Sequence, residues 1–159
     1  MKTAVLLGFC LELGARLGGA SEEDAEHLRQ FGTDVGLAFQ LRDDLLDVYG
    51  DAATFGKRVG GDIVSDKKTF SAASPRWPRP APPSRPYWPG TSASPVADAD
   101  AKVQAVRAVY DELEIRSQTE ALINDYFQDA LQHLERVAAP AELKEPLRHL
   151  ALQLMDRES

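Results

Sequence analysis

The sequence has few cysteines, no long apolar run and no excess of positive charge, and each shortage excludes a class of protein. Cys10 is the single cysteine in 159 residues, which excludes a disulfide framework and a cysteine-based metal site. The apolar run from Val5 to Leu11 is too short to span a bilayer, and we expect a helical core segment with Cys10 buried in it. The formal charge of −7 argues against nucleic-acid binding, which needs a basic face. We expect a cytoplasmic protein.

The chain also lacks the alternating pattern of strands, and we expect an all-α fold. The sequence predicts helices over residues 2–17, 22–49, from 98 or 100 to 113, 118–137, and from Pro140 to about 156. Ser21 with Asp24 predicts the start of the second helix, and Ser117 with Glu120 predicts a capping box for the fourth.

Apolar spacing in the C-terminal third predicts which side chains form the core. The expected core residues are Tyr126, Phe127, Leu131, Leu134, Leu143, Leu147, Leu150 and Leu154. The three histidines stand isolated in the sequence, and we expect each at the surface or in packing: His27, His133 and His149.

Three carboxylates lie inside an apolar, helix-forming stretch between Phe39 and Asp47. Asp43 and Asp47 fall one turn apart on one helix face, and Asp44 points about 100° away. Like charges one turn apart weaken a helix, so the cluster suits a cation such as Mg²⁺, which one or two carboxylates hold together with substrate phosphates. The alternative is an ordinary solvated acidic face.

Two further features accompany this helix. Gly32 and Gly36 are four residues apart on it, and since glycine costs a helix about 1 kcal/mol relative to alanine, we expect close approach of a second helix there. The segment 51–68, DAATFGKRVGGDIVSDKK, is rich in glycine and lysine, as a loop that binds phosphate needs to be. A surface loop without function is the alternative.

These residues closely resemble a known family. The stretch from Gly36 to Thr69, GLAFQLRDDLLDVYGDAATFGKRVGGDIVSDKKT, resembles the second aspartate-rich region of trans-polyprenyl diphosphate synthases, with the pattern FQxxDDxxD, GK, G-x-D and KKT. Lys2-Thr3 resembles the family's KT pair, and residues 102–116 and 126–131 resemble its C-terminal helices. The resemblance covers residues 1–70 and about 99–156. It implies the C-terminal part of an isoprenoid synthase helical bundle.

The resemblance also implies a reaction and its site residues. Family members join an allylic diphosphate to isopentenyl diphosphate and release pyrophosphate, with Mg²⁺ bridging the allylic diphosphate. Carried over by position, the metal residues are Asp43, Asp44 and Asp47, of which Asp43 is our first choice as direct ligand. The diphosphate residues are Lys2, Lys57 and Lys67, and the residues at the reacting centre are Thr3 and Gln40, so that the implied catalytic set is Lys2, Thr3, Gln40 and Lys57. Asp62 is expected to support the ligands, and Arg157 matches the family's basic C-terminal residues weakly.

The sequence departs from the family pattern in two places. It holds no first aspartate-rich motif, so we expect a truncated copy, a C-terminal half with little activity alone. The alternative is a non-catalytic subunit that binds diphosphate, forms a homodimer or pairs with a full-length synthase.

The second departure is a proline-rich segment, residues 71–97, which separates the helices of 1–70 from those of 98–159. Its first 26 residues hold eight of the ten prolines and both tryptophans. Proline at this density prevents a helix, and we expect an irregular insert. A pair of compensating frameshifts, a linker, and a proline-rich ligand built on residues 79–86 are the open explanations.

Overall fold

The protein is built from helices packed along one long central helix. The computed structural model describes residues 2–50, 59–65 and 99–156, and contains six helices and no strand within those ranges. They are α1 (Lys2–Leu17), α2 (Glu22–Tyr49), α4 (Gly61–Val64), α5 (Ala99–Glu112), α6 (Ile115–Arg136) and α7 (Ala141–Met155). The expectation of an all-α fold is therefore confirmed for the described residues, whereas the segment 71–97 lies outside them.

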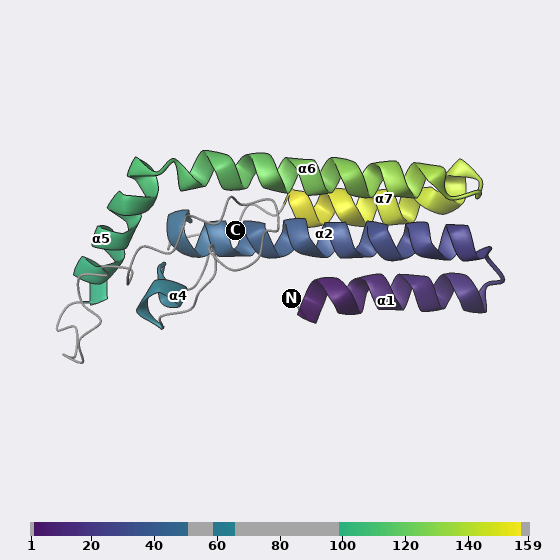
Figure 1. Ribbon diagram of the computed structural model, residues 1–159, viewed down its shortest axis with the longest axis horizontal. Coiled ribbons are helices and arrows are strands. Elements are labelled where there is room, and N and C mark those ends of the chain that lie inside the picture. Colours follow the sequence, from purple (N-terminus) through teal and green to yellow (C-terminus); the bar gives the residue numbers. More distant parts are fainter. Residues whose placement is uncertain (1, 51–58, 66–98, 157–159) are drawn as a thin grey trace, which may run out of the picture.

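Helix α2 lies at the centre of the arrangement. It contacts α1, α4, α6 and α7, with α1 along one side and α6 and α7 along the other (Figure 1). The short α4 and the crosswise α5 lie near the C-terminal end of α2, the end that carries the aspartates (Figure 1).

Two connected apolar clusters hold α2, α6 and α7 together. Phe31 and Val35 on α2 pack with Leu134 on α6, and all three are almost fully buried. The second cluster joins Leu41 and Ile123 and lies closer to the aspartates. At about 25 cal/mol per Å² of apolar surface buried, such side chains are the main source of stability in a bundle. The core predicted for α6 is confirmed in Phe127 and Tyr126, which pack against these clusters.

The first two helices begin and end where the sequence predicts. The turn between them contains Gly19 with a φ of +80°, which favours glycine. Ser21 then caps α2, its hydroxyl accepting a hydrogen bond from the Asp24 amide at 3.1 Å. Local sequence signals were sufficient here because the turn and the cap depend on neighbouring residues.

The start of α6 differs from the prediction. Helix α6 begins at Ile115, after Glu114 with a φ of +52°, and not at Gln118. The Ser117 hydroxyl donates to the Glu114 carbonyl at 3.0 Å, so it lies inside the first turn and does not cap it. Burial of Ile115 against the core explains the earlier start, since packing outweighs a local capping signal. The capping box predicted at Ser117 is therefore wrong.

The last helix keeps its predicted position but presents a different face. Pro140 is its N-cap and not a residue of its first turn. Leu147 and Leu154 pack on the core as expected, whereas Leu143 and Leu150 are exposed. In the first turn of α7, the buried Lys144 donates to the carbonyls of Glu135 and Val137, at 3.1 and 3.3 Å, and so closes the end of α6.

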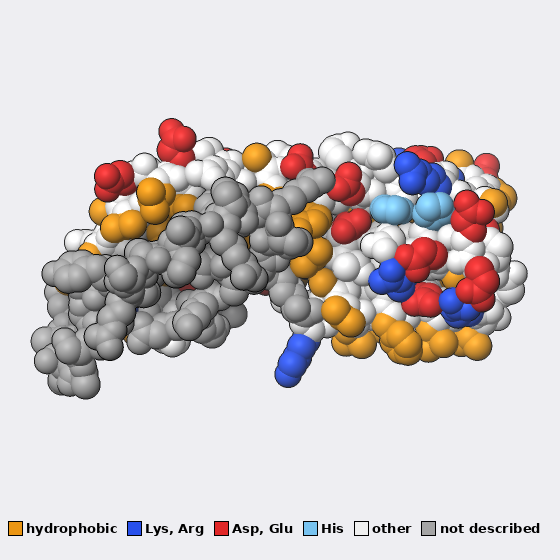
Figure 2. All heavy atoms as spheres, viewed as in Figure 1, with side chains coloured by type: hydrophobic (Ala, Val, Ile, Leu, Met, Phe, Trp, Pro, Cys, Tyr) orange, Lys and Arg blue, Asp and Glu red, His pale blue; other side chains and the backbone are white. Residues whose placement is uncertain are grey.

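The apolar run in α1 is helical as predicted, and part of it packs on the core, but the predicted burial of Cys10 is wrong. Cys10 is exposed, and so are the large apolar side chains Val5, Leu6 and Phe9. Only one side of α1, which includes Ala4 and Gly8, is buried against α2. The run therefore belongs to a helix with an apolar outer face, as Figure 2 shows along the edge formed by α1.

Candidate functional site

The close approach of α1 to α2 positions the first part of the site. A Cβ atom added at Gly36 would lie 2.6 Å from the Ala4 Cα atom, and one at Gly32 would lie 3.0 Å from the Gly8 Cα atom. These contacts leave no room for a side chain, and they confirm that the glycines of α2 permit close approach of a second helix. The two helix axes are thereby drawn together at the N-terminus of α1.

This crossing joins two residues of the predicted reacting centre. The Gln40 Nε2 atom donates to the Thr3 Oγ1 atom at 3.4 Å across the α1–α2 contact. The Oε1 atom of Gln40 is buried and has no hydrogen-bond partner among the described residues. Because the carbonyl end of an amide dipole is negative, this oxygen suits a nearby positive charge. Lys2 lies next to Thr3 at the exposed start of α1.

The three aspartates follow Gln40 on the last turns of α2. Asp43 is exposed, while Asp44 and Asp47 are half-buried. Asp44 faces α5, where its charge adds to burial in raising the pKa of Tyr110. Among the described residues, no group of three or more His, Cys, Asp or Glu side chains converges on one point. A site of one or two carboxylates, completed by phosphate oxygens, is what Mg²⁺ requires, so the residues present fit that ion.

Asp47 connects the aspartate helix to the glycine-rich loop. Its Oδ2 atom accepts a hydrogen bond from the Asp62 backbone amide at 3.0 Å, and its carbonyl accepts one from the Gly60 amide at 2.6 Å. Gly60 has a φ of +82°, and a Cβ atom there would lie 2.5 Å from Val103 of α5. A glycine is therefore needed at this position, and the Asp47 side chain holds the start of α4 in place.

Side chains of α5 and α6 surround Tyr49 at the end of α2, in a cluster that sequence reasoning missed. The Tyr49 hydroxyl donates to Asp111 at 2.9 Å, and the guanidinium groups of Arg107 and Arg116 lie 5.1 and 5.6 Å from the centroid of the Tyr49 ring. Burial first, and then the Asp111 hydrogen bond, raises the pKa of Tyr49 to about 12. These residues fix the end of α2 just beyond the aspartates. No local pattern could reveal them, because the contacts join distant helices.

The structure thus describes most of the predicted site residues and brings several of them into one region. Thr3 and Gln40 are in contact, and Asp47 is bonded to Asp62 in the loop that follows. Lys57 and Lys67 lie outside the described residues, as does Arg157. The catalytic, diphosphate and metal roles assigned to all of these residues stay predictions.

Comparison with known proteins is consistent with this geometry. Residues 1–74 match the family model described as polyprenyl synthetase. Farnesyl diphosphate synthase from Bacillus subtilis is 54% identical over 69 residues, which are 43% of this chain and 23% of that protein. The large subunit 1 of a heterodimeric geranylgeranyl pyrophosphate synthase from Arabidopsis thaliana is 45% identical over 69 residues, 43% of this chain and 19% of that protein.

A solved structure extends the similarity to the C-terminal helices. The crystal structure of a geranylgeranyl pyrophosphate synthase superposes with a TM-score of 0.76 and 32% identity, over 99% of this chain and 49% of that one. The chain is thus similar to an all-α isoprenoid synthase fold, and it spans about half the length of that protein.

Proposed function

We propose that this chain, whose residues 1–74 belong to the polyprenyl synthetase family, binds an allylic diphosphate for prenyl transfer to isopentenyl diphosphate. The observation that carries the proposal is the contact of Gln40 with Thr3, one turn before Asp43 and Asp44 on the same helix. The crossing of α1 and α2 thereby places a polar pair for the reacting centre beside carboxylates suited to a metal.

Each residue has a distinct part in the proposed reaction. Asp43 and Asp44 would hold Mg²⁺, which supplies charge neutralisation to the departing pyrophosphate when it is bound. The Lys2 ammonium group at the start of α1 would attract the diphosphate. The buried Gln40 Oε1 atom would stabilise the allylic cation, while the Thr3 hydroxyl holds the Gln40 amide in orientation.

Binding of a diphosphate and turnover of substrate have different requirements, and we expect this chain to show the first without the second. The sequence contains one aspartate-rich run, whereas family members clasp the diphosphate between two. We therefore propose that the chain binds Mg²⁺ and pyrophosphate but turns over little substrate alone. Its location in the cytoplasm stays a prediction from the sequence.

Calorimetric titration of the full chain with inorganic pyrophosphate, with and without Mg²⁺, tests the proposal. Binding should require Mg²⁺ and should weaken at least tenfold in Asp43→Asn combined with Asp44→Asn. Glu120→Gln, on the exposed side of α6, should bind as the unmodified chain does. Equal binding by all three proteins would overturn the assignment. The expected lack of turnover would be contradicted if the unmodified chain released pyrophosphate from substrate and Asp43→Ala abolished that release.

The exposed face of α1 favours a second candidate function, that of a partner subunit. Leu6 and Phe9 expose 62% and 55% of their surface, and Leu13 and Leu17 continue the same row. Lys2, Val5, Leu6 and Phe9 also line a shallow hollow that is open to solvent. An apolar row of this kind suits a helix of a second copy or of a full-length synthase.

Co-purification distinguishes the two candidates. If the chain is a partner subunit, the tagged chain should retain a full-length polyprenyl synthetase that is mixed with it. The double variant Leu6→Ser, Phe9→Ser should no longer retain the synthetase. Light scattering of the chain alone reports whether a second copy occupies the face. A monomer that retains no synthase would exclude this candidate and leave the binding proposal unaffected.

A further inference from the structure

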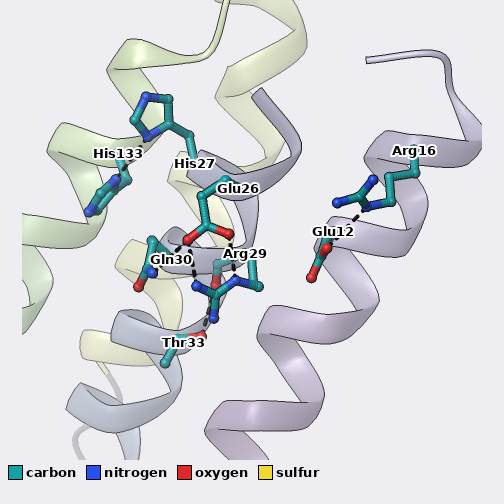
Figure 3. Close-up of polar contacts among 8 residues, drawn as sticks. All are labelled: Glu12, Arg16, Glu26, His27, Arg29, Gln30, Thr33 and His133. Atoms are coloured by element: carbon teal, nitrogen blue, oxygen red, sulfur yellow. Dashed lines mark hydrogen bonds and ion pairs between the residues drawn. The ribbon is translucent and has the colours of Figure 1, made fainter. Parts of the chain in front are cut away.

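Two histidines that are 106 residues apart in the sequence meet on the surface of the bundle. His27 on α2 and His133 on α6 place their Nδ1 atoms 3.1 Å apart, and both rings are partly buried. The ring centroids are 5.3 Å apart and the planes are inclined by 44° (Figure 3). The three histidines stand apart in the sequence, but the fold brings these two together in packing near the surface.

The separation of the nitrogens fits two ligands of one metal ion. Imidazole nitrogens bind such ions at about 2.0–2.1 Å, so two nitrogens 3.1 Å apart subtend roughly 100° at a shared ion. That angle lies between the values for square-planar and tetrahedral coordination. Without an ion, one Nδ1 atom must carry a proton and donate it to the other, since two lone pairs would repel.

The surroundings of His133 favour the form of this ring that can bind a metal. Burial first, then His27 and Arg136, lowers the pKa of His133, so this imidazole is neutral at pH 7, the form that coordinates a cation. The acidic side chains Glu26 and Asp129 act on His133 in the opposite direction and partly offset the charge of Arg136.

The neighbouring carboxylate of Glu26 is already occupied. It accepts hydrogen bonds from Arg29 and Gln30, as Figure 3 shows, and so it does not turn toward the histidines. No third His, Cys, Asp or Glu among the described residues joins the pair. Water would therefore complete the coordination. Both rings are only partly buried, so water and ions can reach them.

We propose that His27 and His133 form a binding site for a transition-metal cation, with Cu²⁺ and Ni²⁺ as the best fits, that bridges α2 and α6. Imidazole suits these ions, and their affinities for nitrogen ligands are high in the divalent series. The site is separate from the aspartates: His27 and Asp43 are 16 residues apart on one helix, or about 24 Å at 1.5 Å per residue. An ion there would tie two helices together and stabilise the folded chain.

Thermal unfolding of the untagged full chain in the presence of Ni²⁺, followed by circular dichroism, tests the site. The midpoint should rise with Ni²⁺ concentration, and the apparent affinity should fall at least tenfold in His27→Gln and in His133→Gln. The matched control is His149→Gln on α7, which is exposed and should leave the effect unchanged. Mg²⁺ at the same concentration should not reproduce it, because that ion prefers oxygen ligands.

Electron paramagnetic resonance of bound Cu²⁺ keeps the test valid if a variant fails to fold. Cu²⁺ bound to the unmodified chain should show magnetic coupling to two nitrogen nuclei, and His149→Gln should show the same signal. Coupling to one nitrogen or none would overturn the proposal. So would an equal loss of Ni²⁺ affinity in all three histidine variants, because binding would then be scattered over the surface.

Discussion

The Asp47 carboxylate accepts a hydrogen bond from the Asp62 backbone amide at 3.0 Å and so links the aspartate helix to the loop that follows it. The family resemblance assigns Asp47 to the metal. In the structure one of its oxygens holds the start of α4, so Asp47 has a structural contact in addition to its predicted role.

Substitution of Asp47 measures the value of this contact. We expect Asp47→Ala to lower the free energy of unfolding by about 1–3 kcal/mol, because a partly buried amide loses its acceptor. Asp47→Asn keeps an acceptor oxygen and should lose less. Urea unfolding of both variants, with amide hydrogen exchange at Asp62, provides the measurement; unchanged protection of that amide in Asp47→Ala would contradict the assignment.

The α1–α2 crossing predicts opposite outcomes for two glycines. Gly36→Ala would place a methyl group 2.6 Å from the Ala4 Cα atom, and we expect a loss of about 1–3 kcal/mol from this overpacking. Gly14→Ala meets nothing within 4 Å and should raise stability by up to about 1 kcal/mol through helix propensity. Chemical unfolding of the two variants should therefore move in opposite directions. A gain in stability in Gly36→Ala would show that the crossing is looser than described.

Asp34 predicts a pH dependence of stability. Burial first, and then the neighbouring Asp129, raises the pKa of Asp34 from 3.8 to about 6. Between these values the folded chain holds a proton that the unfolded chain has released. The free energy of unfolding should therefore fall as the pH rises from about 4 to about 6, and stay lower above that range.

Asp34→Asn isolates this effect. At pH 7 the variant should be more stable than the unmodified chain by about 1 kcal/mol, a modest gain because the half-exposed carboxylate is screened by solvent. Near pH 3.5 the two proteins should be equally stable. Urea unfolding across this range provides the comparison, and a difference that does not change with pH would refute the explanation. Asp129→Asn should also be more stable than the unmodified chain at pH 7, by a smaller amount.

Much of the helical structure could be predicted because it depends on neighbouring residues. Helices α1 and α2 have the predicted bounds, and Ser21 caps α2 as its spacing with Asp24 indicates. The start of α6 was missed because burial of Ile115 outweighs the signal at Ser117. An apolar run does not show which side of its helix another helix covers, which is why Cys10 and Phe9 were wrongly expected in the core.

The sequence by itself determined the helical class, the aspartate run beside its glycine-rich loop, and the resemblance to polyprenyl diphosphate synthases, since all of these are patterns over short stretches of chain. Only the tertiary structure decided that Gln40 meets Thr3 and that His27 meets His133. These pairs are 37 and 106 residues apart, and they meet because core packing sets the register of α1 and α6 on α2. Contacts of that range depend on the summed packing of many side chains, which no local spacing records.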